Sequence, residues 1–176
     1  VQTEKIKNQK EVENVFSDIN GVLILPGFGS RGAEGKIRIA NFARKNKIPF
    51  LGICLGLQCA VIEFARNVCN MEGSNSTEFN KKTRYPVIDL MESQRAIKIK
   101  GGTMRLGAYS CEIKTGTKTY AAYRKKNISE RHRHRYEVNN RYKKALEKNG
   151  LIFSGINKEL GVVETIEIKD HPWYVA

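Results

Sequence analysis

The stretch Gly52-Ile53-Cys54-Leu55-Gly56 decides the fold, because it joins an apolar run that is typical of a buried strand to an amphipathic helix. The run covers Ile48–Ile53, and the helix is predicted to begin near Leu55. At a sharp turn from strand to helix the backbone is crowded, so the neighbours of the central residue must be small. The two glycines meet this need, and the pattern predicts that Cys54 is presented at the edge of the sheet.

Cys54 is the candidate nucleophile of this turn. The first turn of a helix carries unpaired N–H groups and a partial positive charge, which stabilise a thiolate and an oxyanion beside it. The alternative is an ordinary core cysteine, because free cysteine is among the most buried residue types. The other thiols, Cys59, Cys69 and Cys111, are expected to be packed or partly exposed and reduced, and no Cys-x-x-Cys pair indicates zinc or redox chemistry.

The first half of the chain predicts alternating strands and helices. A short strand is expected over Gly21–Leu25, covered on both faces, and a helix over Glu34–Lys45. The strand that ends at Ile53 follows, and then a helix to about Asn70. This alternation predicts a parallel sheet with right-handed crossovers. The polar residues 1–18 are expected to form a loosely packed lead-in.

The pattern changes after residue 70, where shorter elements are expected. They are a polar loop at 74–78, an apolar segment at 87–91, a hairpin-like excursion at 97–113 around a turn at 101–107, a strand at 131–138, a helix at 141–148, paired strands at 151–156 and 161–168, and the start of a strand at 173–176. The whole chain, 1–176, is therefore predicted to be one α/β domain with a central, mostly parallel sheet and a smaller antiparallel excursion.

Length and charge narrow the class of protein. A chain of 176 residues that is 40% hydrophobic fills one core. No run approaches the roughly 18 apolar residues of a membrane span, and the first residues are not a secretion signal, so a soluble cytoplasmic protein is expected. Lys and Arg exceed Asp and Glu by 31 − 18 = 13. The surplus recurs along the chain without a nucleic-acid-binding motif, which favours a solvated basic surface over a nucleic-acid site.

Six segments in order resemble one family, the class I (triad) glutamine amidotransferases, and within it the C-terminal amidotransferase domain of the CTP synthase branch. The resemblance implies a Rossmann-like or flavodoxin-like fold that extends from about Gly21 to the last residue. The segments are Arg31–Lys36, Gly52–Gln58, Asn75–Phe79, Gly101–Gly107, Glu130–Glu137 and His171–Trp173.

The resemblance implies that Cys54 attacks the side-chain amide of L-glutamine, forms a glutamyl thioester and releases ammonia. The backbone N–H groups of Gly27 and Leu55 match the family's oxyanion hole. Gln58, Glu78 and Arg135 match the residues that hold the amino-acid head of the substrate.

The resemblance also implies partners beyond this domain. In the whole enzyme the ammonia is used by a synthetase domain, which consumes ATP with Mg to convert UTP to CTP, with GTP as activator, and the enzyme is a homo-oligomer, expected to be a tetramer. The amidotransferase domain itself needs no cofactor and no metal. Membrane and nucleic-acid partners are not expected.

Two departures from the family pattern bear on activity. The family's general base and its orienting carboxylate belong to a Gln-Phe-His-Pro-Glu-Phe segment that the 176 residues do not contain, so a chain ending at Ala176 is expected to be almost inactive as a glutaminase. Pro26–Gly29 also has one glycine fewer than the family's loop, which bears on the donor role of Gly27. A catalytically silent amidotransferase-like domain with an assembly or regulatory role is the alternative function.

The three histidines are not expected to supply a catalytic base or a metal site. His171 matches a family position upstream of the base, so a structural or surface role is expected. His132 and His134 share one face of a strand, but their three neighbouring arginines would repel a cation and a third ligand is missing, so a metal site is not expected.

Overall fold

The computed structural model describes residues 1–91, 94 and 104–176. Its elements in chain order are η1 Thr3–Lys5, α1 Gln9–Phe16, β1 Val22–Ile24, α2 Ala33–Lys45, β2 Phe50–Gly52, α3 Leu55–Asn67, β3 Asn75–Ser76, β4 Pro86–Leu90, β5 Arg105–Ile113, α5 Lys118–Tyr123, β6 Asn127–His134, β7 Tyr136–Val138, η3 Asn140–Tyr142, α6 Lys143–Lys148, β8 Leu151–Asn157, β9 Val162–Ile168 and β10 Tyr174–Val175.

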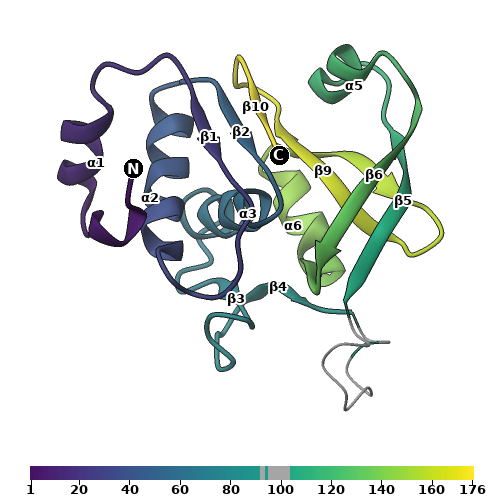
Figure 1. Cartoon of the computed structure of the whole chain (residues 1–176), viewed down its shortest axis with the longest axis horizontal. Coiled ribbons are helices and arrows are strands. Elements are labelled where there is room, and N and C mark those ends of the chain that lie inside the picture. Colours follow the sequence, from purple (N-terminus) through teal and green to yellow (C-terminus); the bar gives the residue numbers. More distant parts are fainter. Residues whose placement is uncertain (92–93, 95–103) are drawn as a thin grey trace.

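The main sheet has the order β1-β2-β10-β9-β8-β5-β6, and a smaller sheet has the order β3-β4-β7. In the main sheet β1, β2 and β10 pair in parallel, whereas the strands from β10 to β6 pair antiparallel. Helices α2 and α3 pack on each other beside β1 and β2, and α1 lies outside α2 (Figure 1). The predicted α/β class is confirmed, as is the predicted pairing of β8 with β9.

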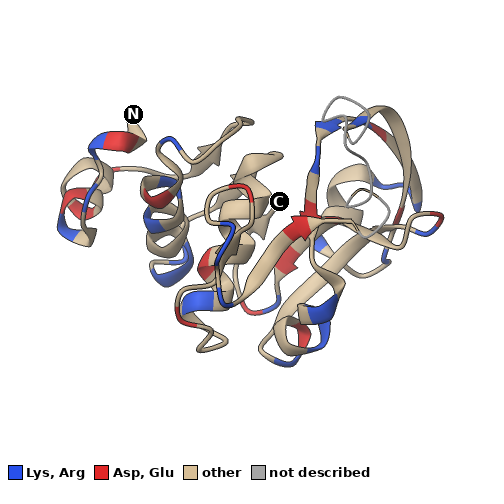
Figure 2. Ribbon diagram, turned by 90° about the horizontal axis from the view of Figure 1, so that it is seen from below, with Lys and Arg blue, Asp and Glu red and all other residues tan. Residues whose placement is uncertain are grey.

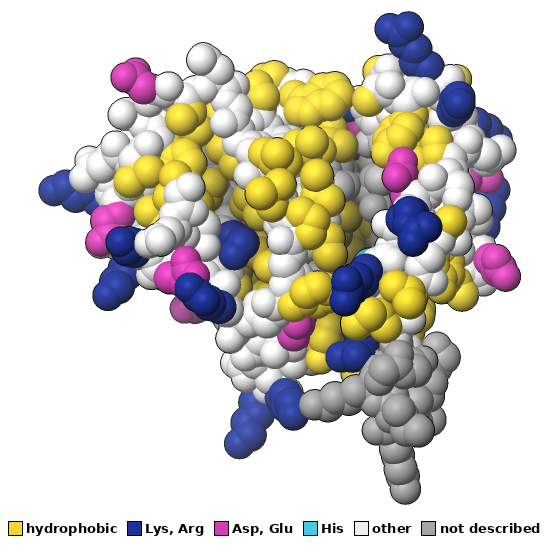
Figure 3. All heavy atoms as spheres, viewed as in Figure 1, with side chains coloured by type: hydrophobic (Ala, Val, Ile, Leu, Met, Phe, Trp, Pro, Cys, Tyr) yellow, Lys and Arg dark blue, Asp and Glu magenta, His cyan; other side chains and the backbone are white. Residues whose placement is uncertain are grey.

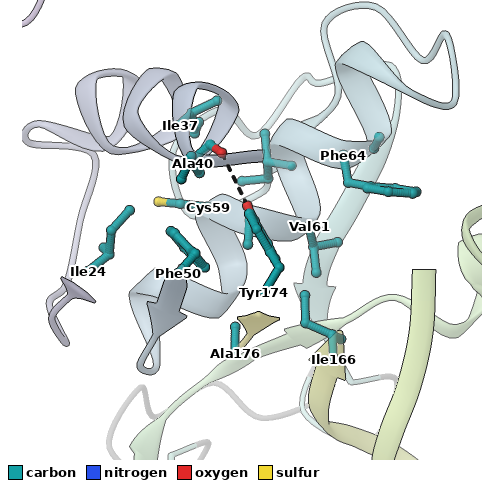
Figure 4. Packing of buried hydrophobic residues seen from close by; sticks show 14 of the residues in the cluster. Ile24, Ile37, Ala40, Phe50, Cys59, Val61, Phe64, Ile166, Tyr174 and Ala176 are labelled. Carbon is teal, nitrogen blue, oxygen red and sulfur yellow. Dashed lines mark hydrogen bonds between the residues drawn. The ribbon is translucent and has the colours of Figure 1, made fainter. Parts of the chain in front are cut away.

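The core lies between the parallel strands and the helices that cover them. Phe50 of β2 stacks on Tyr174 of β10, with ring centroids 4.2 Å apart, and both side chains are fully buried. The Tyr174 hydroxyl donates to the carbonyl of Ala40 in α2 at 3.5 Å (Figure 4). Burial of these aromatic rings fixes β2, and with it the strand end from which Cys54 follows.

Two expectations about the first half of the chain are wrong. Residues 1–18 are not a loose lead-in, because Ile6 and Val12 are buried and the carbonyl of Ile6 accepts from the Arg38 side chain at 3.2 Å. The strand β1 is not covered on both faces, because Leu23 is 54% exposed beside a 41% exposed Leu51. Among the described residues the helices cover only one face here, and Figure 3 shows hydrophobic side chains over this region.

The expected hairpin at 97–113 falls partly on residues outside those that the structure describes. Its second half is β5, which begins at Arg105 and pairs with β6 and β8. Residues 105–107, which were expected to be part of the turn, therefore belong to the strand β5. The strand expected at 131–138 is present but is interrupted at Arg135, where β6 ends in the main sheet before β7 begins in the small one.

Candidate active site

Cys54 occupies a strained turn between β2 and α3. Its backbone angles are φ 55° and ψ −103°, in a region that residues with a side chain rarely adopt. Backbone hydrogen bonds hold the turn on both sides, from Ile53 N–H to the carbonyl of Ile24 at 2.9 Å and from Gly56 N–H to the carbonyl of Ile53 at 2.9 Å. Such strain persists only where the surroundings enforce it, and it is typical of functional sites.

The glycines on each side of Cys54 are required by close backbone packing. A Cβ atom on Gly52 would lie 2.8 Å from the backbone carbon of Gly56, and one on Gly56 would lie 2.5 Å from the carbonyl oxygen of Ile24. Both obstacles are backbone atoms, which cannot rotate away. The Gly-x-Cys-x-Gly spacing thus lets α3 start directly on the edge formed by β1 and β2.

Gly56→Ala is expected to lower the free energy of unfolding by about 1–3 kcal/mol, because the new methyl group overpacks against the backbone of β1. Urea unfolding followed by circular dichroism measures the change. Gly21→Ala is the matched control, because a Cβ there would meet its nearest atom, the carbonyl oxygen of Pro49, at 3.5 Å, an ordinary contact. Equal stability of both variants would show that the start of α3 can shift at no cost.

The residue Cys54 is only partly buried, so it is not an ordinary core cysteine. Burial raises the pKa of the Cys54 thiol, backbone N–H groups of Leu55 and Gly27 lower it, and the charges of Glu78 and Glu137 raise it further. The net pKa is raised. The expectation of a thiolate held ionised by the helix is therefore wrong, because partial burial outweighs the two N–H groups. Attack by this thiol requires a base that removes its proton.

The two candidate oxyanion donors, Gly27 and Leu55, lie beside the sulfur. Their N–H groups are the two backbone donors that act on the Cys54 thiol, and a Cβ on Gly27 would approach the Leu55 side chain to 2.9 Å. Gly27 thus lies beside the turn that carries Cys54, although the loop after Pro26 has one glycine fewer than the loop of the family. Because both N–H groups lower the pKa of the Cys54 thiol, they lie close to the atom beside which an oxyanion would form.

A cavity of about 390 Å³ opens beside Cys54. Gln58, one helical turn further along α3, also lines it. The Gln58 side chain is 6% exposed, its Nε2 donates to the carbonyl of Tyr136 at 3.2 Å, and its Oε1 has no partner among the described residues. The structure thus places the predicted nucleophile and one predicted substrate residue in the same cavity, with an amide oxygen left to accept a hydrogen bond.

Glu78 and Arg135 do not line this cavity, although they lie near the site. Glu78 Oε1 accepts from the N–H of Gly29 at 2.8 Å, which ties the loop after Pro26 to the segment after β3. The pKa of the Tyr136 hydroxyl is raised mainly by burial. The charge of Glu78 raises this pKa further, and the charge of Arg135 lowers it. Glu78 and Arg135 therefore both lie near Tyr136, a residue that does line the cavity.

A buried polar cluster on the opposite wall of the cavity was not predicted. Arg105, which is 3% exposed, donates from Nη1 to Glu137 at 3.0 Å and from Nη2 to Glu164 at 2.6 Å. His132 and His134 of β6 lie against these carboxylates, at 3.5 Å from Glu164 and 3.3 Å from Glu137 respectively. The alternation of β6 does point both histidines to one face, but the partners come from β5, β7 and β9, and only the fold brings these strands together.

The other predictions about single residues have clear outcomes. His171 is structural, as expected: its ring Nε2 bonds to the carbonyl of Ala43 at 3.1 Å and its Nδ1 accepts from the N–H of Trp173 at 3.2 Å. Cys59 and Cys111 are buried, Cys69 is partly buried, and all are free thiols. Within the described ranges there is no group of three His, Cys, Asp or Glu residues placed to hold a metal ion.

Two surface features bear on the class of protein. Lys and Arg residues are spread over helices and loops at both ends of the molecule, as the blue parts of the ribbon in Figure 2 show, which agrees with a solvated basic surface. The helices in the described part of the chain are too short or too polar to cross a membrane.

The comparison with protein families identifies the family of the chain. The family model of class-I glutamine amidotransferases matches residues 1–176. The chain belongs to this family, as its six motifs predicted.

The most similar relatives that we compared are CTP synthases. The chain is 61% identical over 161 residues to CTP synthase from Chlorobium luteolum, covering 92% of this chain and 27% of that protein. It is 57% identical over 166 residues to CTP synthase from Chlorobaculum tepidum, covering 94% and 29% respectively. The chain therefore spans less than a third of the length of these relatives.

A solved structure shows the same fold. It is the glutaminase domain of Trypanosoma brucei CTPS with bound acivicin, which is 34% identical to this chain with a TM-score of 0.92, and the match covers 100% of this chain and 69% of that one. The predicted similarity to the amidotransferase domain of CTP synthase is thus confirmed.

Proposed function

We propose that this chain is the glutamine-hydrolysing part of a CTP synthase, and that Cys54 is its nucleophile. The observation that carries the proposal is the strained cysteine at the start of α3, which is partly exposed and contacted by the N–H groups of Gly27 and Leu55. Membership of the amidotransferase family and the high identity to CTP synthases support the same reaction.

In the proposed reaction the Cys54 sulfur attacks the side-chain carbonyl carbon of L-glutamine. The carbonyl oxygen gains negative charge, which the N–H groups of Gly27 and Leu55 stabilise. Collapse of this intermediate breaks the carbon–nitrogen bond, releases ammonia and leaves a thioester, which water converts to glutamate. The thiol proton goes to a base and from there to the departing nitrogen. In the family this base belongs to a segment that the 176 residues do not contain.

Gln58, Glu78 and Arg135 are proposed to hold the amino-acid head of glutamine. Gln58 offers its unpartnered Oε1 inside the cavity. Glu78 and Arg135 carry opposite charges near Tyr136, which suits the ammonium and the carboxylate of one amino acid. The ammonia is proposed to pass to a synthetase domain of the intact protein, which makes CTP from UTP with ATP and Mg and is activated by GTP in a homotetramer.

A chloroketone shaped like glutamine tests the site directly, because it needs the nucleophile and the binding residues but no ammonia acceptor. We expect mass spectrometry to find one adduct on Cys54, and L-glutamine to slow its formation at least about tenfold more than D-glutamine does, because only one configuration matches both charges. A chloroketone without the amino-acid head is the control reagent and should label Cys54 far more slowly, because the residues that hold the head cannot bind it. Equal labelling of Cys69, or the absence of protection by L-glutamine, would contradict the proposal.

A further inference from the structure

A single residue joins the two sheets beside the cavity. His134 is the last residue of β6 and pairs with Arg105 in the main sheet, whereas Tyr136 is the first residue of β7 and pairs with Leu90 in the small sheet. Only Arg135 lies between them, and it belongs to neither strand. The backbone at this joint therefore determines where the Arg135 side chain begins.

The ring of His134 spans this joint through a hydrogen bond. Its Nδ1 lies 3.2 Å from the carbonyl oxygen of Tyr136, two residues further along the chain. A carbonyl oxygen can only accept, so Nδ1 carries the hydrogen. Oε1 of Glu137 lies 3.3 Å from the same nitrogen and, as an acceptor, favours the same tautomer. Burial, followed by the charges of His132 and Arg105, lowers the pKa of His134 to about 4, so the ring is neutral at pH 7.

The other nitrogen of the ring is held as well. With its hydrogen on Nδ1, the neutral ring of His134 has a lone pair on Nε2, and Nδ1 of His132 lies 2.8 Å from it as the donor. The His134 side chain is only 15% exposed, so water competes little for either bond. A ring that is fixed at both nitrogens can hold the carbonyl to which it donates.

The same carbonyl also orients Gln58 of α3. Nε2 of Gln58 donates to the carbonyl of Tyr136 at 3.2 Å, so the amide nitrogen is turned toward Tyr136. A carbonyl oxygen has two lone pairs, and here it accepts one donor from β6 and one from α3. Movement of this carbonyl would therefore displace Gln58 together with the joint that carries Arg135.

We propose that His134 is a positioning residue for the amino-acid head of glutamine, because it holds the Tyr136 carbonyl and thereby sets the places of Gln58 and Arg135. The inference rests on the proposed function, which assigns these two residues to the head. His134 acts through them and need not touch the substrate. Its loss should therefore weaken recognition of the head and leave the reactivity of the Cys54 thiol unchanged.

Labelling of Cys54 in the intact protein by two reagents tests this role. The chloroketone shaped like glutamine depends on both the head and the thiol, whereas the chloroketone without the head depends on the thiol alone. We expect His134→Leu to slow labelling by the first reagent at least about tenfold, because small displacements of binding groups cost rate factors of this order or more. Labelling by the second reagent should not change. The preference for L-glutamine over D-glutamine as the protecting ligand should fall by a similar factor.

Two further variants separate this role from a loss of packing. His134→Asn is the rescue variant, because the asparagine Nδ2 is as many bonds from the backbone as Nδ1 of histidine and can donate to the Tyr136 carbonyl. His171→Leu is the matched control: His171 is also buried and bonded to a backbone carbonyl, that of Ala43, but it is not among the residues that line the cavity. Both variants should be labelled by the glutamine-shaped reagent at close to the rate of the unsubstituted protein.

An unchanged rate for His134→Leu, or an equal loss for His134→Leu and His134→Asn, would overturn the proposal. If His134→Leu does not fold, ¹⁵N NMR of the histidine rings in the unsubstituted protein decides. We expect the hydrogen of His134 on Nδ1; a hydrogen on Nε2 alone would overturn the proposal, because the ring could not then donate to the Tyr136 carbonyl.

The two proposals fail in different ways. If Cys54 of the unsubstituted protein is not labelled, or is not protected by L-glutamine, the proposed function is contradicted. Normal labelling and protection there, combined with an unchanged His134→Leu, would contradict only the positioning role of His134.

Discussion

Replacement of Cys54 by alanine is expected to reduce glutamate release from L-glutamine by about 10⁴-fold or more in the intact protein, because no thioester can form without the sulfur. The remaining groups still bind the substrate and stabilise charge, so the substrate affinity should change far less than the rate. Glutamate release measured over a range of glutamine concentrations separates the two effects.

Cys69→Ala is the matched control for this prediction. Cys69 is also a free and partly buried thiol, but burial raises its pKa to about 11, its sulfur lies 3.9 Å from the carbonyl of Ala145, and it does not line the cavity. Its replacement should leave glutamate release near that of the unsubstituted protein. Turnover by Cys54→Ala within tenfold of that level would remove Cys54 from the mechanism.

The nucleophile turn could be predicted from sequence because its causes are local. Gly52 and Gly56 are glycines since backbone atoms lie within 3 Å of where their Cβ atoms would be, and this need is visible as a spacing of residues. The protonation state of Cys54 could not be predicted in the same way. It depends on how deeply the sulfur lies and on the charges of Glu78 and Glu137, which come from distant parts of the chain.

The buried polar cluster around Arg105 was even harder to predict, because its residues come from distant parts of the chain. Arg105 and Glu164 are 59 residues apart, and no periodicity relates them. A buried arginine between two carboxylates is unfavourable until the partners meet, so the sequence alone gave no reason to place it inside. The basic surplus of the chain was expected to form a solvated surface, and Arg131 and Arg133 are exposed, whereas the side chains of His132 and His134 are only 12% and 15% exposed and lie against Glu164 and Glu137.

The exposure of one face of the parallel strands could not be predicted from the sequence either. Short apolar runs predict burial, but they do not say whether one or both faces are covered. Leu23 and Leu51 alternate with buried neighbours in β1 and β2, and the helices that the sequence places next to these strands both pack on the opposite face. The sequence pattern therefore predicted the strands correctly and their surroundings incorrectly.

Arg105→Met is expected to lower the free energy of unfolding by about 3–5 kcal/mol near neutral pH, because it leaves the carboxylates of Glu137 and Glu164 buried without their cation. The loss should depend on pH. Burial already raises the pKa of Glu137 from 4.5 to about 7, although Arg105 acts to lower it, so removal of Arg105 raises this pKa further. A carboxyl with a higher pKa in the folded state binds protons more tightly there, so stability falls as pH rises through that window. The loss should thus be greater at pH 8 than at pH 5.

Lys158→Met provides the control, because it breaks an ion pair with Glu112 in which the lysine side chain is 71% exposed. Such an exposed pair contributes little to stability, and its loss should vary little between pH 5 and pH 8. Urea unfolding of both variants at the two pH values gives the comparison. A loss for Arg105→Met that matches the control, or that is greater at pH 5, would show that the two carboxylates do not depend on Arg105, because they would then hold their protons or reach water without it.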